Sequence, residues 1–239
     1  MKIKTLETGF EKYNIEYTEE MEQKFIEFKE LLLEWNKKIN ITRIEDEEEI
    51  YVKHYLDSVM LLRDGYIDNF KNKKIIDIGT GGGFPGLPMK IIEKSLDVTL
   101  LDSLKKRMDF LDLVIKDLKL DNTRTIHGRA EDFGQAEEHR EKYDFCVSRA
   151  VAQLNVLTEY CLPFVKVGGY FIAMKSNISQ EIENAEKAVE LLGGKIEKIE
   201  DVSLPNSDIN RKIIYIKKIE ATAKKYPRKA GTPSKKPLI

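Results

Sequence analysis

KKIIDIGTGGGFPG, residues 73–86, is the stretch in which a run of β-branched residues ends at an acid and gives way to glycines. The isoleucines on either side of Asp77 are typical of a strand that is buried on both faces of a parallel sheet. The glycines favour a tight turn whose backbone can approach a ligand, and Pro85 is suited to open the helix that follows. A strand, a glycine turn and a helix in this order predict the ligand crevice of a doubly wound α/β sheet.

The spacing of the glycines indicates which cofactor this crevice binds. A dinucleotide site has the pattern G-x-G-x-x-G. Here an acid precedes three glycines at intervals of two: Asp77, Gly79, Gly81 and Gly83. This form resembles the first motif of class I S-adenosylmethionine (SAM) methyltransferases, in which an acid at the end of the second strand binds the ribose. Residues 98–102, VTLLD, supply such a strand and end at Asp102. Asp102 could instead only cap the helix that begins at Ser103, but the two features together predict SAM as cofactor.

The composition predicts one main domain with an appendage. The chain has 239 residues, of which 41% are hydrophobic and 34% charged, so it can bury one substantial core. No apolar run is long enough to cross a bilayer, and the first ten residues lack the apolar core of a signal peptide. We therefore expect a cytoplasmic protein that does not bind a membrane. Cys146 and Cys161 lack metal-ligand or redox spacing, which predicts two buried thiols and no metal site.

Charge is distributed unevenly along the chain. Residues 211–239 contain ten Lys or Arg and one acid and carry +9, whereas the rest of the chain carries -10. A basic segment attached to an acidic body is expected to bind a polyanion. Its last part, residues 221–239, has three prolines and no periodicity, so we expect it to be extended or disordered until it binds. The candidate phosphate contacts in this tail are Lys224, Lys225, Arg228 and Lys229.

Hydrophobic periodicity divides the chain into a helical N-terminal extension, residues 1–64, and a domain of alternating strands and helices, residues 65–220. The extension is expected to contain helices over 18–39 and 50–62. After the first strand, the predicted strands are 98–102, 123–127, 144–148, 170–174, 195–204 and 211–218, and the predicted helices are 85–95, 104–118, 154–164 and 179–192. Ser103 is expected to cap the second of these helices, and Gly168-Gly169 to form a turn. The two adjacent closing strands predict a mostly parallel, seven-stranded sheet with one antiparallel strand at its closing end.

The residues that follow each strand form the expected wall of the site, because ligands of doubly wound sheets bind outside the carboxyl ends of the strands. These are residues 79–84, 102–103, 128–132, 148–150 and 175–176. Glu131 could equally be a solvated loop acid. Arg149 ends an apolar strand, where an unpaired cation is costly, so we expect a carboxylate or a ligand beside it. Lys175 suggests the site of ribose methyltransferases, but Ser148-Arg149 stands where their Asp is expected.

Motifs along nearly the whole chain resemble the RsmG (GidB) family of bacterial 16S rRNA guanine-N7 methyltransferases. They are Trp35-Asn36, Asn40-Ile41-Thr42, His54-Tyr55-Leu56-Asp57-Ser58, residues 77–86, Leu101-Asp102-Ser103 with Lys106-Arg107, Arg129-Ala130-Glu131, Ser148-Arg149-Ala150 and the tail from Tyr226 to Pro233. The resemblance implies a class I fold with an N-terminal helical extension, SAM as methyl donor, and a guanine in 16S rRNA of the small ribosomal subunit as acceptor. The cofactor contacts that it implies are Gly79, Phe84, Ala130, Glu131 and Arg149. Lys53 stands where family members often have Arg, so a phosphate contact there would lose the fork geometry of a guanidinium.

The implied reaction needs no general base, because guanine N7 holds an unprotonated lone pair at neutral pH and catalysis can come from alignment and electrostatics. His54 and Asp57 lie one helical turn apart, where they could meet the substrate, or Asp57 could simply orient a partly buried His54. The candidate cofactor contacts are Gly79, Gly81, Phe84, Asp102, Ser103, Ala130, Glu131 and Arg149. The candidate substrate contacts are His54, Asp57, Lys175, Lys224, Lys225, Arg228 and Lys229.

Two other functions stay open at this point: a SAM-dependent methyltransferase of a small molecule or protein, and a non-catalytic RNA-binding or nucleotide-sensing protein. Nothing in the sequence indicates an oligomer.

Overall fold

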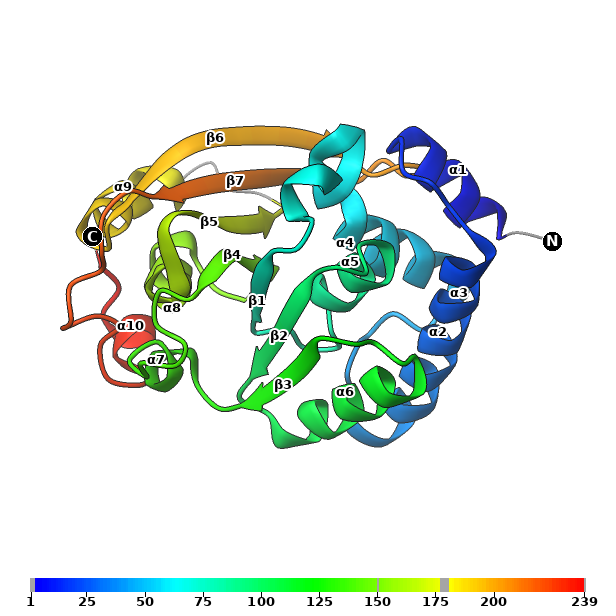
Figure 1. Cartoon of the computed structure of the whole chain (residues 1–239), viewed down its shortest axis with the longest axis horizontal. Coiled ribbons are helices and arrows are strands. Elements are labelled where there is room, and N and C mark those ends of the chain that lie inside the picture. The colour runs from blue at the N-terminus through cyan, green and yellow to red at the C-terminus, as the bar shows by residue number, and fades with distance from the viewer. Residues whose placement is uncertain (1–2, 150, 177–180, 239) are drawn as a thin grey trace.

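The computed structural model describes residues 3–149, 151–176 and 181–238, so Ala150 of the expected wall and Ser179, the expected start of a helix, lie outside the described residues. Seven strands form one sheet in the order β3-β2-β1-β4-β5-β7-β6 (Figure 1). Their bounds are β1 Lys74–Ile78, β2 Asp97–Asp102, β3 Thr123–His127, β4 Tyr143–Arg149, β5 Val165–Lys175, β6 Gly194–Ser203 and β7 Asn210–Lys218. Strand β7 pairs antiparallel with both β5 and β6, and the other neighbours are parallel. The predicted fold class is confirmed, and the antiparallel strand lies second from the sheet edge because β6 and β7 form a hairpin.

Alternation along the strands divides the core into two layers. Ile75 of β1 belongs to the cluster that contains the N-terminal helices, α5 (Gly86–Ile92) and α6 (Lys105–Asp117). Its neighbour Ile76 belongs to the cluster that contains α8 (Leu154–Cys161), the 3-10 turn η3 (Leu162–Phe164) and α9 (Glu181–Leu191). This period of two is what a strand buried on both faces requires. Both free cysteines are buried in the second cluster, as predicted.

The N-terminal helices share the core of the sheet domain. They are α1 Lys4–Lys12, α2 Glu19–Ile39, α3 Glu47–Ile50, a π-helical turn η1 Tyr51–Leu56, α4 Asp57–Val59 and a kinked 3-10 segment η2 Met60–Phe70. Thr18 accepts a hydrogen bond from the Met21 N–H at 3.3 Å, which confirms the predicted start of α2. Phe28 stacks on Phe84 of the glycine loop with ring centroids 5.3 Å apart. Among the described residues, no helix is long and apolar enough to span a membrane.

The helix expected over 50–62 is confirmed: α3, η1, α4 and the start of η2 follow one another without a break, and the first non-helical φ/ψ values are those of Arg63. Two other local predictions were wrong. Ser103 does not cap α6, because the N-cap residue is Leu104 and no side chain caps the helix; Asp102 Oδ1 accepts the N–H of Leu104 itself at 2.9 Å. The expected turn at Gly168 lies inside β5, where the register with β4 shifts between Tyr143 and Phe145. Gly168 has a φ of +89°, a conformation that suits such a bulge.

The C-terminal segment is packed against the body, not extended or disordered as expected. We call residues 222–238 the C-terminal strap; in Figure 1 it passes beside α7 (Ala130–Phe133) and α8 and contains α10 (Thr232–Lys235). Tyr226, Pro227 and Pro233 are buried. The composition did not predict this packing, because prolines and lysines are typical of disordered tails. The apolar residues among them pack against residues that lie far away in the sequence.

Candidate functional site

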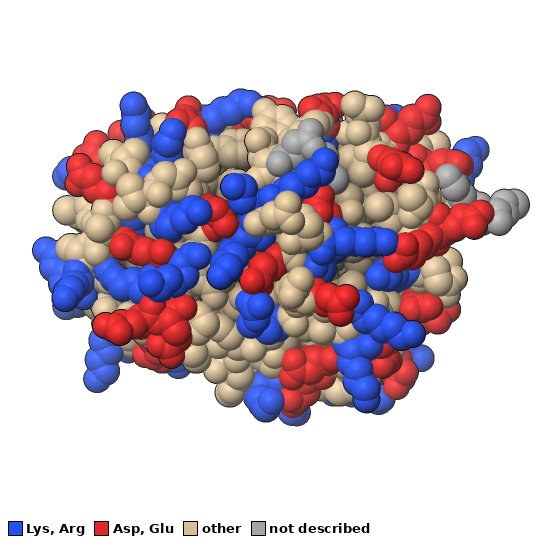
Figure 2. Space-filling model, in the orientation of Figure 1, with Lys and Arg blue, Asp and Glu red and all other residues tan. Residues whose placement is uncertain are grey.

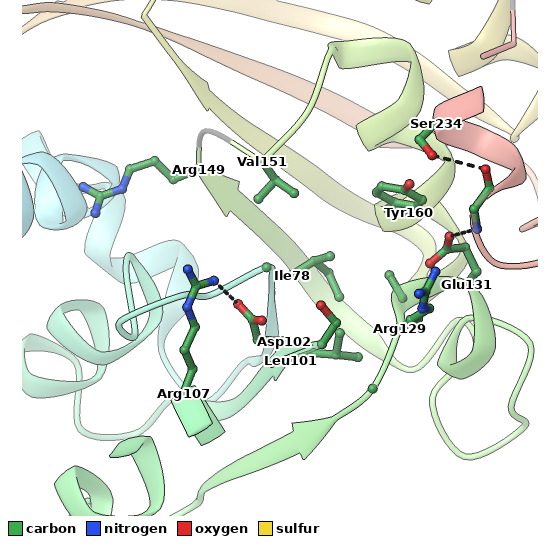
Figure 3. A pocket seen from close by; sticks show the side chains of 15 residues that line it. Ile78, Leu101, Asp102, Arg107, Arg129, Glu131, Arg149, Val151, Tyr160 and Ser234 are labelled. Atoms are coloured by element: carbon green, nitrogen blue, oxygen red, sulfur yellow. Dashed lines mark hydrogen bonds and ion pairs between the residues drawn. The ribbon is translucent and has the colours of Figure 1, made fainter. Parts of the chain in front are cut away.

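A cavity of about 520 Å³ opens at the carboxyl ends of β1, β2, β3 and β4 (Figure 3). Gly79 follows β1, Asp102 and Ser103 follow β2, and Ala130 and Glu131 follow β3. Further wall residues are Arg107 on α6, Arg149 at the end of β4, Val151 after it, Tyr160 on α8, and Gly231 and Ser234 of the C-terminal strap. The strand-end rule therefore located the cavity, although several residues of the expected wall do not line it: 80–84, Asp132, Ser148, Lys175 and Ser176.

The glycine loop is shaped by close approaches that other residues could not make. Gly79 has a φ of +69°, and a Cβ there would lie 2.6 Å from Val151 Cγ2. At Gly83, with a φ of +94°, a Cβ would lie 2.6 Å from Leu87 Cδ1. Both positions need glycine because their backbone conformation is costly for other residues and the neighbouring side chains fill the space.

Asp77 braces this loop from below. Its Oδ2 accepts the Thr80 hydroxyl at 2.7 Å and the Gly86 N–H at 2.9 Å, and the whole side chain is buried. Its Oδ1 has no hydrogen-bond partner within the part of the chain that the structure describes. Burial is the main cause that raises the pKa of Asp77 to about 6, against the hydrogen bonds that lower it. Asp77 therefore shapes the loop and does not line the cavity.

Asp102 connects the glycine loop to α6 at the cavity wall. Its Oδ2 accepts the Gly81 N–H at 3.0 Å and Arg107 Nη1 at 3.2 Å, and its Oδ1 accepts the Leu104 N–H. The carboxylate is only 4% exposed. Sequence reasoning quoted Arg107 within a motif but did not identify it as the partner of Asp102. The sequence signal that could have identified this pair is the place of Arg107 in the first turn of α6, five residues after Asp102.

Glu131 faces the cavity and is held by the C-terminal strap. Its Oε1 accepts the Gly231 N–H at 2.8 Å, and its side chain is largely buried, so it is not a solvated loop acid. Ser234 donates its hydroxyl to the Gly231 carbonyl oxygen at 3.2 Å (Figure 3). Sequence reasoning missed Tyr160, Gly231 and Ser234 as wall residues. No local pattern could have found the bond between residues that are a hundred positions apart.

Arg149 has the carboxylate partner that the sequence led us to expect, and that partner is Asp57. Arg149 Nη1 donates to Asp57 Oδ2 at 2.7 Å and to the Lys53 carbonyl oxygen at 3.1 Å. In Figure 3 the guanidinium points away from the centre of the cavity. It lies over the Phe84 ring at 5.3 Å, and Phe84 in turn stacks on His54 at 4.5 Å. The Phe84 side chain is thus enclosed by the N-terminal helices, and cofactor contact at Phe84 and Arg149 stays a prediction.

His54 and Asp57 belong to the same cluster, beside the cavity. Burial, with Arg149 as the second cause, lowers the pKa of His54 to about 3, so the imidazole is neutral. His54 Nδ1 faces Arg149 Nη2 at 3.4 Å, so Nε2 carries the proton and donates to Thr42 Oγ1 at 2.9 Å. Asp57 is 1% exposed and also accepts Arg211 Nε at 2.9 Å. Arg149 bridges the two residues, and substrate contact by either of them stays a prediction.

The remaining candidates for substrate contact are of two kinds. Lys175 is buried, donates to the Ala152 carbonyl oxygen at 2.5 Å and pairs with Glu181 at 2.8 Å. Arg228 pairs with the buried Glu159, with Nη2 and Oε2 2.6 Å apart. Lys224, Lys225 and Lys229 are exposed. Figure 2, in the orientation of Figure 1, shows a band of Lys and Arg side chains across the face that is turned to the viewer, with acidic groups between them.

The cavity fits the SAM that the sequence predicts. Its volume lies within the range of small-molecule pockets. Asp102 accepts three N–H groups, whereas a carboxylate has about four lone-pair positions, which leaves one for a hydroxyl such as that of a ribose. Glu131 provides a second acceptor across the cavity, and the glycine loop brings backbone to its edge. Within the described ranges, no group of three or more His, Cys, Asp or Glu could hold a metal ion.

Comparisons with known proteins agree over nearly the full chain. The family model GidB, described as rRNA small subunit methyltransferase G, matches residues 21–214. A protein of Alkaliphilus oremlandii named ribosomal RNA small subunit methyltransferase G is 52% identical over 98% of this chain and 97% of its own length. A protein of the same name from Acetivibrio thermocellus is 53% identical over 98% and 96%.

Among solved structures, MtNAS in complex with MTA and tNA has a TM-score of 0.54 at 14% identity and covers 83% of this chain and 71% of that chain. M. jannaschii TYW2 in complex with AdoMet has a TM-score of 0.50 at 17% identity and covers 62% and 70%. At these identities the likeness concerns the fold.

Proposed function

This chain belongs to the GidB family, the rRNA small subunit methyltransferases G, and from that premise we propose that it transfers a methyl group from SAM to N7 of a guanine in 16S rRNA. The observation that carries the proposal is the match to relatives of that name at about half identity over almost the whole of both chains. A match of this extent includes the glycine loop, the cavity acids and the C-terminal strap. The two alternatives from the sequence have no comparable support.

The cavity residues support a donor-binding role. When bound, SAM supplies an electrophilic methyl group on a sulfonium. Asp102 is positioned to accept a ribose hydroxyl, with Arg107 and the Gly81 N–H holding its carboxylate in place. Ala130 and Glu131 form the opposite wall. Orientation of the donor by fixed groups is the contribution that a direct transfer to a nitrogen lone pair requires.

Guanine N7 suits this site because its lone pair is free at neutral pH. His54, which stacks on Phe84 of the glycine loop, is neutral, buried and engaged through both ring nitrogens, so it is poorly placed as a general base. The surroundings of His54 therefore do not support activation of the acceptor by removal of a proton. Electrostatic stabilisation by fixed dipoles and charges supports the transfer instead.

The polyanionic partner expected from the charge asymmetry is the rRNA of the small subunit. Exposed lysines of the C-terminal strap, including Lys224 and Lys229, are suited to phosphate contacts that position the RNA without selecting a base. A ribosomal substrate also supports a cytoplasmic location for the enzyme.

The proposal is tested with radiolabelled SAM and 30S subunits from a strain that lacks the protein. We expect label in 16S rRNA, and borohydride with aniline should cleave the RNA at the new N7-methylguanine. Asp102→Ala should abolish transfer, whereas Asp109→Ala, an exposed acid on α6 paired with Lys105, should retain it. Absence of transfer by protein that binds SAM would refute the proposed reaction. Label without cleavage at a guanine would refute the N7 position.

A further inference from the structure

We propose that the C-terminal strap is a shared wall between the cofactor cavity and the RNA surface, so that SAM and rRNA bind cooperatively. This inference rests on the proposed function. The inner edge of the strap fixes Glu131 through the Gly231 N–H, and its outer edge presents exposed lysines to the solvent. The C-terminal strap therefore contributes to the site itself and is not a flexible basic tail.

The inner edge contributes directly to the cavity. Gly231 and Ser234 line it together with Glu131, although α7 and the strap are far apart in the sequence. The Gly231 N–H donates to Glu131 Oε1 at 2.8 Å, and Gly231 has a φ of +80°, which a residue with a side chain adopts at a cost. Because a hydrogen bond to a carboxylate is stronger than one between neutral groups, this bond sets where the carboxylate points. Gly231 is therefore a positioning residue for Glu131.

The position of the strap is set from outside the cavity. Arg140 donates Nη1 to the Tyr226 carbonyl oxygen at 2.8 Å and Nη2 to the Thr222 carbonyl oxygen at 2.5 Å. Gln135 Nε2 donates to the Pro227 carbonyl oxygen at 2.8 Å. The buried Glu159 accepts both the backbone N–H of Arg228 at 2.8 Å and its guanidinium. None of these anchoring side chains lines the cavity, so they can be changed without touching the cofactor surface.

The outer edge of the strap carries exposed cations. None of its five lysines forms an ion pair with any residue that the structure describes: Lys224, Lys225, Lys229, Lys235 and Lys236. Lys229 stands two residues before Gly231, and Lys235 and Lys236 follow Ser234 closely. Phosphates that engage these lysines hold the same short segment that holds Glu131.

Cooperative binding follows from this arrangement. A ligand that orders Glu131 also orders Gly231 and the lysines beside it, and RNA on those lysines orders Glu131 in return. Such a coupling is reciprocal, and each ligand must raise the affinity of the other by the same factor.

Hydrogen exchange of the full-length protein tests the inner edge. S-adenosylhomocysteine (SAH) should slow exchange of the amides of residues 222–238 in the wild-type protein. Glu131→Ala should speed exchange in the free protein, and Glu131→Gln, which keeps an oxygen for the Gly231 N–H, should restore the slow rate. If bound SAH leaves the exchange of the strap unchanged, the inference is overturned and the proposed function stands. If the wild-type protein does not bind SAH, the proposed function itself fails.

Calorimetric titration tests the coupling. Arg140→Ala should weaken SAH binding by roughly fivefold or more, the lower end of measured couplings between sites. The matched control Arg124→Ala removes an arginine that pairs with Asp97 at 2.7 Å outside the cavity and should leave SAH affinity unchanged. Saturating 16S rRNA should tighten SAH binding to the wild-type protein, and Arg140→Ala should reduce this effect. Equal SAH affinity with and without RNA would overturn the inference.

Discussion

Replacing Asp77 by asparagine should stabilise the protein in a way that depends on pH. Asp77 is fully buried, and burial raises its pKa from an ordinary value of 3.8 to about 6. Folding therefore favours the protonated form, and ionisation costs stability as the pH rises from about 4 to about 6. The difference of about two pKa units corresponds to about 3 kcal/mol at 1.36 kcal/mol per unit. An asparagine side chain is neutral at every pH and escapes this cost.

Urea unfolding of both proteins between pH 4 and pH 7 measures the effect. The free energy of unfolding of Asp77→Asn minus that of the wild-type protein should increase by about 2 kcal/mol over this range, because the carboxyl group of the unfolded chain is already partly ionised at pH 4. Its value at pH 4 also contains any loss of the bonds to Thr80 and Gly86, but that loss is constant with pH. The pH-dependent part therefore isolates the titration of Asp77.

The same substitution at Asp144 provides a control of opposite sign. Burial acts to raise the pKa of Asp144, but the Lys166 side chain and the Lys74 N–H outweigh it, so the pKa is lowered. The wild-type carboxylate then contributes stability above its unfolded pKa, and that stability is lost as the pH falls. Asp144→Asn should therefore lose stability relative to wild type as the pH rises. A difference for Asp77→Asn that is flat between pH 4 and pH 7, or that follows the Asp144 control, would refute the argument from burial.

Three further changes test other parts of the structure. Asp57→Ala leaves two largely buried arginines without their carboxylate and should lower the free energy of unfolding by about 3 kcal/mol, measured in urea; an unchanged midpoint would show that this pair is not needed. His54→Phe removes a group whose pKa is about 3 in the folded protein and 6.5 in the unfolded chain, so the variant should lose less stability than the wild-type protein as the pH falls from 6.5 to 3. Equal loss of stability in acid would contradict this prediction. Replacing Lys224, Lys229, Lys235 and Lys236 by Gln should weaken rRNA binding, measured as affinity at several salt concentrations. The slope of log affinity against log salt concentration should fall by roughly 0.7 to 0.9 for each phosphate that the variant no longer neutralises, and an unchanged slope would exclude these lysines from the RNA interface.

The parts of this fold that could be predicted from the sequence are those encoded by neighbouring residues. The run of isoleucines around Asp77 predicted a strand with two covered faces, and Ile75 and Ile76 do belong to different layers of the core. The glycines after Asp77 predicted the turn that borders the cavity. Asp102 could be placed at the site because a strand end and a helix start are both local signals. The mostly parallel sheet with one antiparallel strand followed from the alternation of elements and the two adjacent closing strands, whereas the strand order came from the structure.

Only the tertiary structure decided which distant groups meet. It paired Arg149 with Asp57, enclosed Phe84 among the N-terminal helices, and brought Gly231 to Glu131. It also turned a proline-rich basic tail into an ordered wall. Hydrophobic periodicity and the residue preferences of turns extend over only a few residues, so they can be recognised directly in a sequence. The partner of a buried charge depends instead on which surfaces pack together once the whole chain has folded.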